Sequence, residues 1–233
     1  MTKGKHAMHQ NILYVSNFHE LVATPFHGEI NAICWRRDLE CDFAEIVGKI
    51  DLVENIIELD EEALLKLDLS DQGQLAREVI LQDLHLLKAH GALPSLNLIK
   101  CYELDDAKAI VQTDVYSFHV DSSPIPTDTF LCTYYGASSE ILPNEQAEQK
   151  VLIASIRDEL KKQFGNSNDG FELFLNENCF DLHYQPKENA SPISLGVGLL
   201  WRLSTAHPES EVLPCIHRAP KEKNGEPRLI MIC

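Results

Sequence analysis

The chain has 233 residues, of which 44% are hydrophobic and 24% are charged, as in an ordinary globular protein. Its 36 acidic and 20 basic residues give a formal net charge of −16. That balance argues against nucleic acid as a partner, because phosphate binding needs clustered Lys and Arg. No apolar run is long enough to cross a bilayer, and residues 1–10 lack the apolar core of a signal peptide. We therefore expect no membrane span and a cytoplasmic location.

The cysteine pattern points to free thiols. Their number is odd and no C-x-x-C occurs, so neither a disulfide framework nor a zinc knuckle is predicted. Reduced thiols fit the expected cytoplasmic location. The seven cysteines are Cys34, Cys41, Cys101, Cys132, Cys179, Cys215 and Cys233.

The first part of the chain changes from a strand pattern to a helical one. Residues 11–38 contain short β-prone runs at 12–15 and 30–35. Residues 41–91 have helical periodicity, with an acidic start at 60–62 and an apolar stripe that ends before Gly91. We expect this region to be a helical support for the rest of the fold.

From residue 96 onward the pattern is mainly β. Strands are predicted over 96–102, 109–120, 129–135, 171–175, 179–184, 193–203, 213–219 and 228–233, with one amphipathic helix over 145–164. The fold class that this favours is α+β, mainly β: a closed double-sheet architecture with supporting N-terminal helices. We expect a single domain over residues 1–233.

A candidate metal site begins at Phe118-His119-Val120-Asp121. Residues i and i+2 of a strand point to the same face, so His119 and Asp121 would lie side by side. One further His would complete a two-His, one-carboxylate triad, which leaves coordination positions open and suits non-haem Fe(II). The His-x-Asp pair alone is weak evidence, but it ends a predicted strand and opens onto a Pro-broken loop, where functional sites are common.

The last two predicted strands supply the remaining candidates. His217 is a candidate third metal ligand, and Arg228 opens the otherwise apolar terminal strand. A guanidinium near the metal can bind the distal carboxylate of 2-oxoglutarate in a bidentate manner. Thr129, Tyr134 and Tyr135, on the strand after the His-x-Asp loop, are candidates for hydrogen bonds to the cosubstrate or substrate, and simple packing is an equal alternative for the two tyrosines.

Two other features of the sequence bear on this set of candidate residues. Asp181-Leu182-His183 also alternates and is a rival carboxylate–imidazole pair, but no Arg follows it at a suitable spacing. Arg218, next to His217, should face away from the metal by alternation and is interpreted as structural.

The order His-x-Asp, distant His, ten residues, Arg resembles the 2-oxoglutarate/Fe(II)-dependent dioxygenase superfamily. Four segments across nearly the whole chain also resemble a bacterial domain family of unassigned function: residues 31–37, 118–121, 132–144 and 217–220. The resemblance implies a double-stranded β-helix, or jelly roll. It also implies Fe(II) held by His119, Asp121 and His217, with 2-oxoglutarate as cosubstrate.

The function that we expect is an Fe(II)- and 2-oxoglutarate-dependent oxygenase, most simply a hydroxylase. A cupin-like metal enzyme with the same triad but without 2-oxoglutarate is the first alternative. A non-catalytic metal-binding or interaction protein, and a triad formed by coincidence, are the others. The motifs specify no substrate.

Overall fold

The computed structural model describes residues 9–221 and 225–233, and the first eight residues, which bear on the signal-peptide prediction, lie outside these ranges. The chain is a mixture of helices and strands in which strands dominate, and the strands form two curled, mostly antiparallel sheets. Within the described ranges, no helix has the length and apolarity needed to cross a bilayer.

The larger sheet has seven strands and contains both the first and the last strand of the chain. Among the described residues, β1 and β2 of this sheet pair in parallel, and the other neighbouring strands pair antiparallel. In spatial order the strands are β1 (Ile12–Val15), β2 (Ala32–Trp35), β11 (Leu200–Ser204), β6 (Asp128–Tyr135), β13 (Arg228–Ile232), β4 (Ser95–Ile99) and β3 (Ile56–Leu59).

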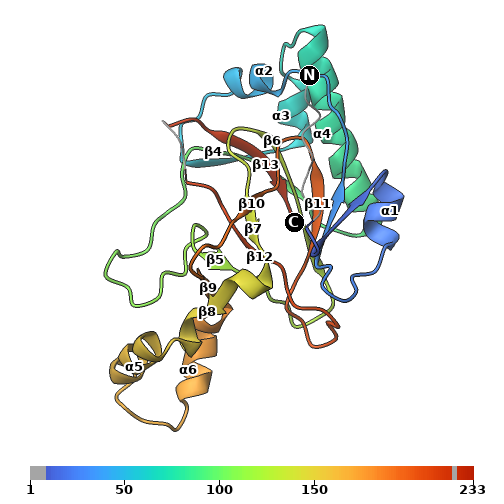
Figure 1. Ribbon diagram of the computed structural model, residues 1–233. Coiled ribbons are helices and arrows are strands. Elements are labelled where there is room, and N and C mark those ends of the chain that lie inside the picture. The colour runs from blue at the N-terminus through green and yellow to red at the C-terminus, as the bar shows by residue number, and fades with distance from the viewer. Residues whose placement is uncertain (1–8, 222–224) are drawn as a thin grey trace.

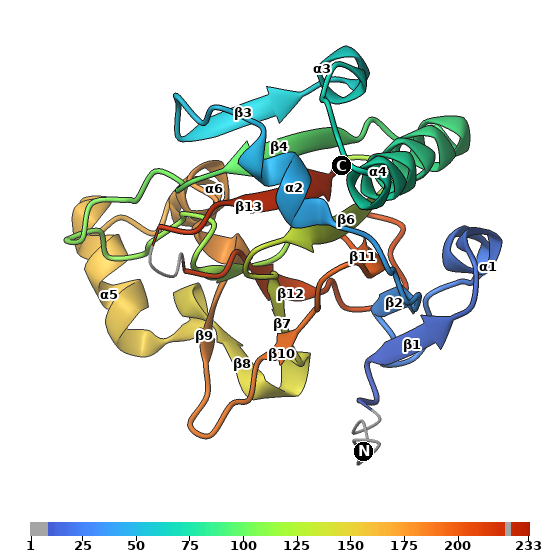
Figure 2. The same ribbon diagram turned by 90° about the horizontal axis from the view of Figure 1, so that it is seen from above.

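The smaller sheet has six short strands, all paired antiparallel, and lies on one side of the larger sheet (Figures 1 and 2). In spatial order they are β10 (Ile193–Ser194), β7 (Glu140–Leu142), β12 (Ile216–Arg218), β5 (Phe118–His119), β9 (His183–Pro186) and β8 (Ala147–Gln149).

Helices cover the other side of the larger sheet. Figure 2 shows α2 (Phe43–Gly48), α3 (Glu61–Leu65) and α4 (Asp71–His90) over that side, with α1 (Phe18–Ala23) next to β1. The Ser70 side chain caps the start of α4, and Gly91 ends the helix in the left-handed conformation with φ 96°. The expected helical support is therefore present, although its range also contains β3.

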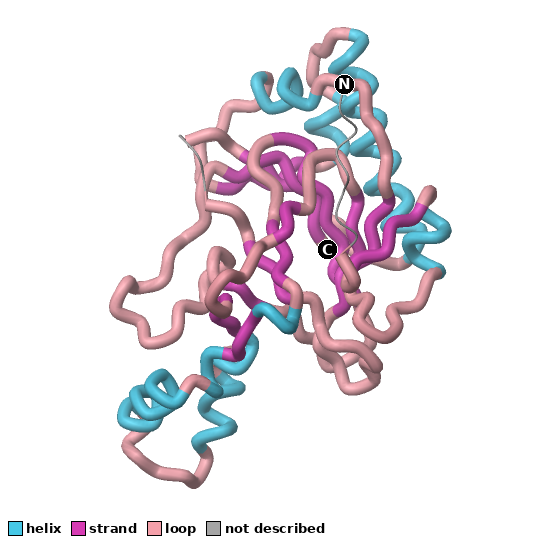
Figure 3. The backbone as a smooth tube through the Cα atoms, in the orientation of Figure 1, coloured by secondary structure: helices cyan, strands magenta, loops and turns pink. Residues whose placement is uncertain are grey.

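A second helical group, α5 (Ala154–Gln163) and α6 (Phe171–Glu177), extends beyond the smaller sheet (Figures 1 and 3). Short 3-10 turns connect it: η1 (Asn144–Gln146), η2 (Lys150–Leu152) and η3 (Phe180–Leu182). The strand predicted over 171–175 is therefore wrong, since Phe171 and Leu175 are buried one helical turn apart. The helix predicted over 145–164 forms only from residue 154, after β8 and two turns.

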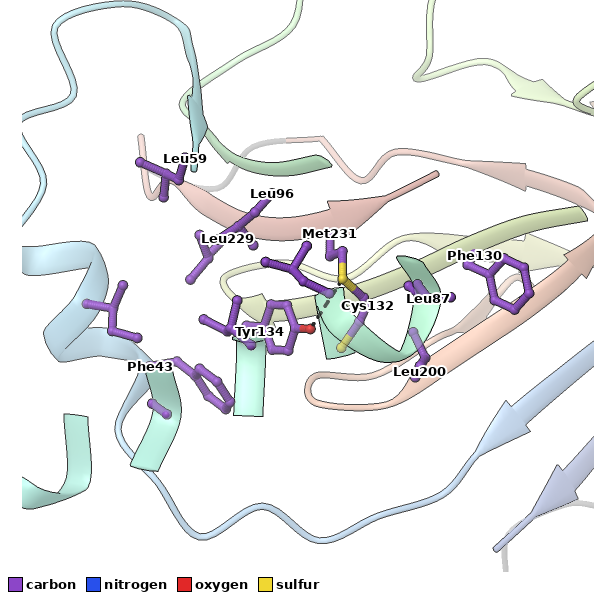
Figure 4. Packing of buried hydrophobic residues seen from close by; sticks show 14 of the residues in the cluster. Phe43, Leu59, Leu87, Leu96, Phe130, Cys132, Tyr134, Leu200, Leu229 and Met231 are labelled. Carbon is purple, nitrogen blue, oxygen red and sulfur yellow. Dashed lines mark hydrogen bonds between the residues drawn. The ribbon is translucent and has the colours of Figure 1, made fainter. Parts of the chain in front are cut away.

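Alternate side chains of β6 face two different regions: the apolar cluster under the helices and the space between the two sheets. Phe130, Cys132 and Tyr134 belong to the large apolar cluster under the helices, and Figure 4 shows them with Met231 and Phe43. The alternate residues face the smaller sheet, where Leu131 packs in a second cluster with Ile141 of β7. This period-2 separation places polar side chains of β6 between the sheets.

A buried polar network ties α4 to the larger sheet. Asp83 on α4 is fully buried and accepts hydrogen bonds from Arg37 Nη1 and Nη2 at 2.6 and 2.5 Å. The Tyr134 hydroxyl donates to Asp83 Oδ2 at 2.7 Å. Burial raises the pKa of Tyr134 well above its usual range, so the phenol keeps its proton and donates.

Thiol labelling will distinguish the cysteines by burial. Burial raises the pKa of Cys34 and of Cys132 to about 12 and also raises that of Cys215, whereas Cys179 is exposed. Only the thiolate reacts, so at pH 8 we expect 5,5′-dithiobis(2-nitrobenzoate) to modify Cys179 first. The three buried thiols should react only after denaturation; fast reaction of Cys215 in the native protein would contradict this packing. Peptide mapping after a short pulse measures it.

Candidate metal centre

The two histidines of the predicted triad face each other across neighbouring strands of the smaller sheet. His119 on β5 is paired in register with His217 on β12, and their ring centroids are 4.6 Å apart. The residues that precede the two histidines, Phe118 and Ile216, pack in a cluster on the other side of this sheet. Both imidazoles therefore point between the two sheets.

Each imidazole is held by a backbone carbonyl. His119 Nδ1 lies 2.7 Å from the carbonyl oxygen of Ser117, and His217 Nδ1 lies 3.2 Å from that of Cys215. A carbonyl can only accept, so both Nδ1 atoms carry the proton and both Nε2 lone pairs are free to bind a metal. Burial, followed by the neighbouring His217, lowers the pKa of His119, which favours the neutral ligand form.

Asp121 completes the group from the loop that follows β5. One ligand atom from each of His119, Asp121 and His217 lies within 4.8 Å of the others, and His217 Nε2 is 3.6 Å from Asp121 Oδ2. Ligands on one face of an octahedral ion are about 3 Å apart for bond lengths near 2.1 Å. Small side-chain movements would therefore bring the three onto one ion.

A contact from the larger sheet holds the Asp121 carboxylate, and one from a neighbouring loop holds its backbone. The Thr129 hydroxyl on β6 donates a short hydrogen bond to Asp121 Oδ2. The backbone carbonyl of Asp121 accepts from the N–H of Ala206 at 2.8 Å. Thr129, expected to bind a cosubstrate or substrate, thus positions a candidate metal ligand.

Arg228 reaches the space between the sheets from β13. It is 1% exposed, and its Nη2 donates to the Ser139 hydroxyl at 3.0 Å. Ser139, itself buried, lies two residues before Ile141, which pairs with His217. Two strand residues span roughly 7 Å, so the Arg228–Ser139 pair lies about that far along the sheet from the level of His217.

Gly136 allows β13 to start this close to β6. Its φ is +82°, and a Cβ at this position would lie 2.4 Å from the carbonyl oxygen of Pro227 and 3.2 Å from Arg228 Cα. A side chain here would push the start of β13, and with it the Arg228 backbone, away from β6.

The two candidate tyrosines do not join the triad. Tyr134 is fully buried under the helices, with its hydroxyl on Asp83, because it alternates with Thr129 on β6 and so faces the other side. Tyr135, beside a register shift in the β6–β13 pairing, packs half-buried against the same cluster. For both tyrosines the structure favours the packing alternative.

Arg218 and His183 are two residues near the triad: the first faces away from it and the second lies beside it. Arg218 faces away from the triad, as expected: it binds Glu140 Oε2 through Nε at 2.9 Å and Nη2 at 2.7 Å, and lies over the Phe118 ring. His183, considered with Asp181 as a rival pair, is instead a neighbour of the triad. His183, on β9, is paired in register with His119 on β5, and their ring centroids are 5.6 Å apart.

Comparisons with family models, with curated proteins and with solved structures give no significant match to this chain. The site is therefore interpreted from its own geometry. It contains two imidazoles with free Nε2 atoms, an oriented carboxylate, and a buried guanidinium further along the same interior.

Proposed function

We propose that the protein is an Fe(II)- and 2-oxoglutarate-dependent oxygenase. The observation that carries the proposal is the convergence of His119, Asp121 and His217 between the sheets, with Arg228 held further along the same interior. Two imidazoles and one carboxylate on one face of a metal leave positions for a chelating cosubstrate and for O₂, an arrangement suited to non-haem Fe(II).

The strand order supports a double-stranded β-helix. From β4 onward, β5, β6 and β7 alternate between the smaller and the larger sheet, as do β11, β12 and β13 at the end of the chain. Such alternation wraps one continuous chain around a common interior. His119 and His217 belong to the smaller sheet and Arg228 to the larger, so the wrapped fold would face them toward one another.

The interior also offers polar groups for a dicarboxylate. Arg228 and Ser139 can bind a carboxylate together, because a guanidinium and a hydroxyl both donate to its oxygens. Thr133 on β6 is 1% exposed, and its hydroxyl has no hydrogen-bond partner among the described residues. An unsatisfied buried hydroxyl is costly, so a ligand oxygen near it would be stabilised. These residues fit the distal part of 2-oxoglutarate.

In this proposal each residue has a separate role. Bound Fe(II), with 2-oxoglutarate and O₂, would supply the oxidising chemistry and release succinate and CO₂. His119 and His217 keep fixed tautomers through the Ser117 and Cys215 carbonyls, and Thr129 orients the Asp121 carboxylate.

An anaerobic titration tests the assignment directly. Fe(II) is added to the metal-free protein, and 2-oxoglutarate is then titrated while the visible metal-to-ligand charge-transfer band is followed. We expect a saturable band at one equivalent of iron. Stoichiometric iron without any band would favour the cupin-like alternative, tight Zn(II) with no turnover would favour a non-catalytic metal site, and no stoichiometric metal would mean that the triad is coincidental.

The carboxylate site has its own prediction. Arg228→Lys and Ser139→Ala should each weaken 2-oxoglutarate binding about tenfold, because each removes one charge-assisted hydrogen bond worth roughly 1.5 kcal/mol. Iron binding should remain stoichiometric, since neither side chain belongs to the triad. The anaerobic titration gives both quantities, and Arg218→Lys, on the opposite face of the smaller sheet, is the matched control. Unchanged 2-oxoglutarate affinity in both variants would place the cosubstrate elsewhere.

A further inference from the structure

A row of polar side chains continues past the metal ligands across the smaller sheet. His217 is paired with His119, and His119 with His183. The β8–β9 pairing ends at Gln149 with Tyr184, and the next residue, Lys150, begins the 3-10 turn η2. Its Nζ donates to the hydroxyl of Ser117, two residues before His119, and its charge acts on His183, so Lys150 lies beside the outer end of this row.

His183 is a buried imidazole with unused hydrogen-bonding capacity. It is 4% exposed, and its Nδ1 has no partner among the residues that the structure describes. The group of ligand atoms that lie within 4.8 Å of one another includes His119 but not His183. His183 is thus a neighbour of the candidate metal site rather than a fourth ligand.

Lys150 brings a half-buried ammonium group to the same place. Its Nζ donates to the Ser117 hydroxyl at 2.7 Å and lies 3.3 Å from the Gln112 carbonyl oxygen. Both partners are neutral, and no carboxylate oxygen of a described residue lies within 4.0 Å of Nζ. Burial lowers the pKa of Lys150. A nearby anion would offset that desolvation cost.

The charges of Asp105 and Asp114 act on Lys150 and His183, but both carboxylates are hydrogen-bonded within their own loop. Asp105 Oδ2 accepts from the Thr113 hydroxyl at 3.0 Å and from the Asp114 N–H at 3.1 Å. Asp114 Oδ1 accepts from the N–H groups of Tyr116 and Ser117 at 3.1 and 3.2 Å. The hydrogen bonds of both carboxylates are thus made within this loop, and neither carboxylate forms an ion pair with Lys150, so the ammonium keeps donor capacity for a ligand.

We propose that Lys150 and His183 form an oxyanion-binding subsite beside the metal, which holds a carboxylate or phosphate group of the substrate. The role of this group as part of a substrate rests on the proposed oxygenase function. Lys150 supplies charge and hydrogen bonds, and Nδ1 of His183, which has no hydrogen-bond partner among the described residues, supplies one more donor. The protein would then select small anionic substrates and orient them by that group.

The first experiment uses the metal-free full chain, so that no anion can bind to a metal. Inorganic phosphate and acetate are titrated separately at pH 7.5 while the side-chain ¹⁵N resonances of the histidines are followed by NMR. We expect a saturable shift of the His183 resonances with at least one anion, and the stronger of the two identifies the group. No saturable shift with either anion would overturn the proposal.

Variants separate a specific subsite from general electrostatics. Lys150→Met should weaken the anion at least tenfold, Lys150→Arg should restore most of the affinity, and Lys161→Met on α5 should change nothing. Equal binding by Lys150→Met and the wild-type protein would overturn the subsite.

A second experiment distinguishes a failure of the anion subsite from a failure of the proposed oxygenase function. In the anaerobic Fe(II) protein, Lys150→Met should leave 2-oxoglutarate binding unchanged. Weaker 2-oxoglutarate binding in this variant would make Lys150 a cosubstrate residue and would also overturn the subsite. A missing charge-transfer band in the wild-type protein contradicts the oxygenase assignment but leaves anion binding to the metal-free chain measurable.

Discussion

Replacement of His119 by alanine is expected to abolish both iron binding and succinate formation. The candidate ligand set found among the described residues has three side chains, and His119 supplies one of its two imidazoles. Two remaining ligands cannot hold one face of an octahedral ion. We expect at least a hundredfold loss of iron affinity and at least a thousandfold loss of 2-oxoglutarate-dependent succinate formation, roughly the effect of losing a whole catalytic group. Asp121→Ala should behave in the same way.

Matched controls make this result specific. His85 is an exposed histidine of α4 bound to Glu61, so His85→Ala should retain both iron and activity. Thr129→Val removes only the hydrogen bond to Asp121 and should cost about tenfold to a hundredfold in metal affinity, as is usual for outer-shell partners. Metal analysis after Fe(II) reconstitution, with quantified succinate, measures each variant. Stoichiometric iron in His119→Ala would contradict the assigned ligand set.

Asp83→Ala is expected to cause the largest loss of stability of any single change considered. The substitution leaves the Arg37 guanidinium without its carboxylate and the Tyr134 hydroxyl without its acceptor. Removal of one partner of a buried ion pair typically costs about 3–5 kcal/mol, a large part of the total stability of a domain. Urea denaturation followed by circular dichroism gives the free energy of unfolding.

Two further variants test the cause. Tyr134→Phe removes one neutral donor and should cost about 1 kcal/mol. Glu61→Ala breaks exposed ion pairs from α3 to Lys88 and His85 of α4 and should change little. If Asp83→Ala were no less stable than Glu61→Ala, the buried pair would not hold α4 to the sheet.

The sequence was informative where a local period determines the answer. Alternation along one strand predicts that Phe118 turns away from His119, and that Arg218 turns away from His217, as the structure has them. The same rule separates Thr129 from Tyr134, which are five residues apart and so face opposite sides of β6. Only one of these two candidates for ligand binding can therefore face the space between the sheets.

The sequence was less informative where the same residues are compatible with both helix and strand periodicity. It was also less informative where a contact depends on pairing between strands that are far apart in the chain. Phe171, Phe174 and Leu175 fit a helix as well as a strand, and the buried face of α6 shows which one forms. Ser139, which binds Arg228, had no motif of its own. The place of His183 beside His119 depends on the β5–β9 register, which no local pattern encodes.

The strands that carry the two histidines are barely joined to each other. The β5–β12 pairing is a single register pair, His119 with His217, and β5 itself has two residues. An ion shared by these side chains would act as a cross-link between segments that are far apart in the chain, and its binding energy would be added to the stability of the folded state. If iron is that ion, as proposed, iron supply would then influence how long the folded protein persists.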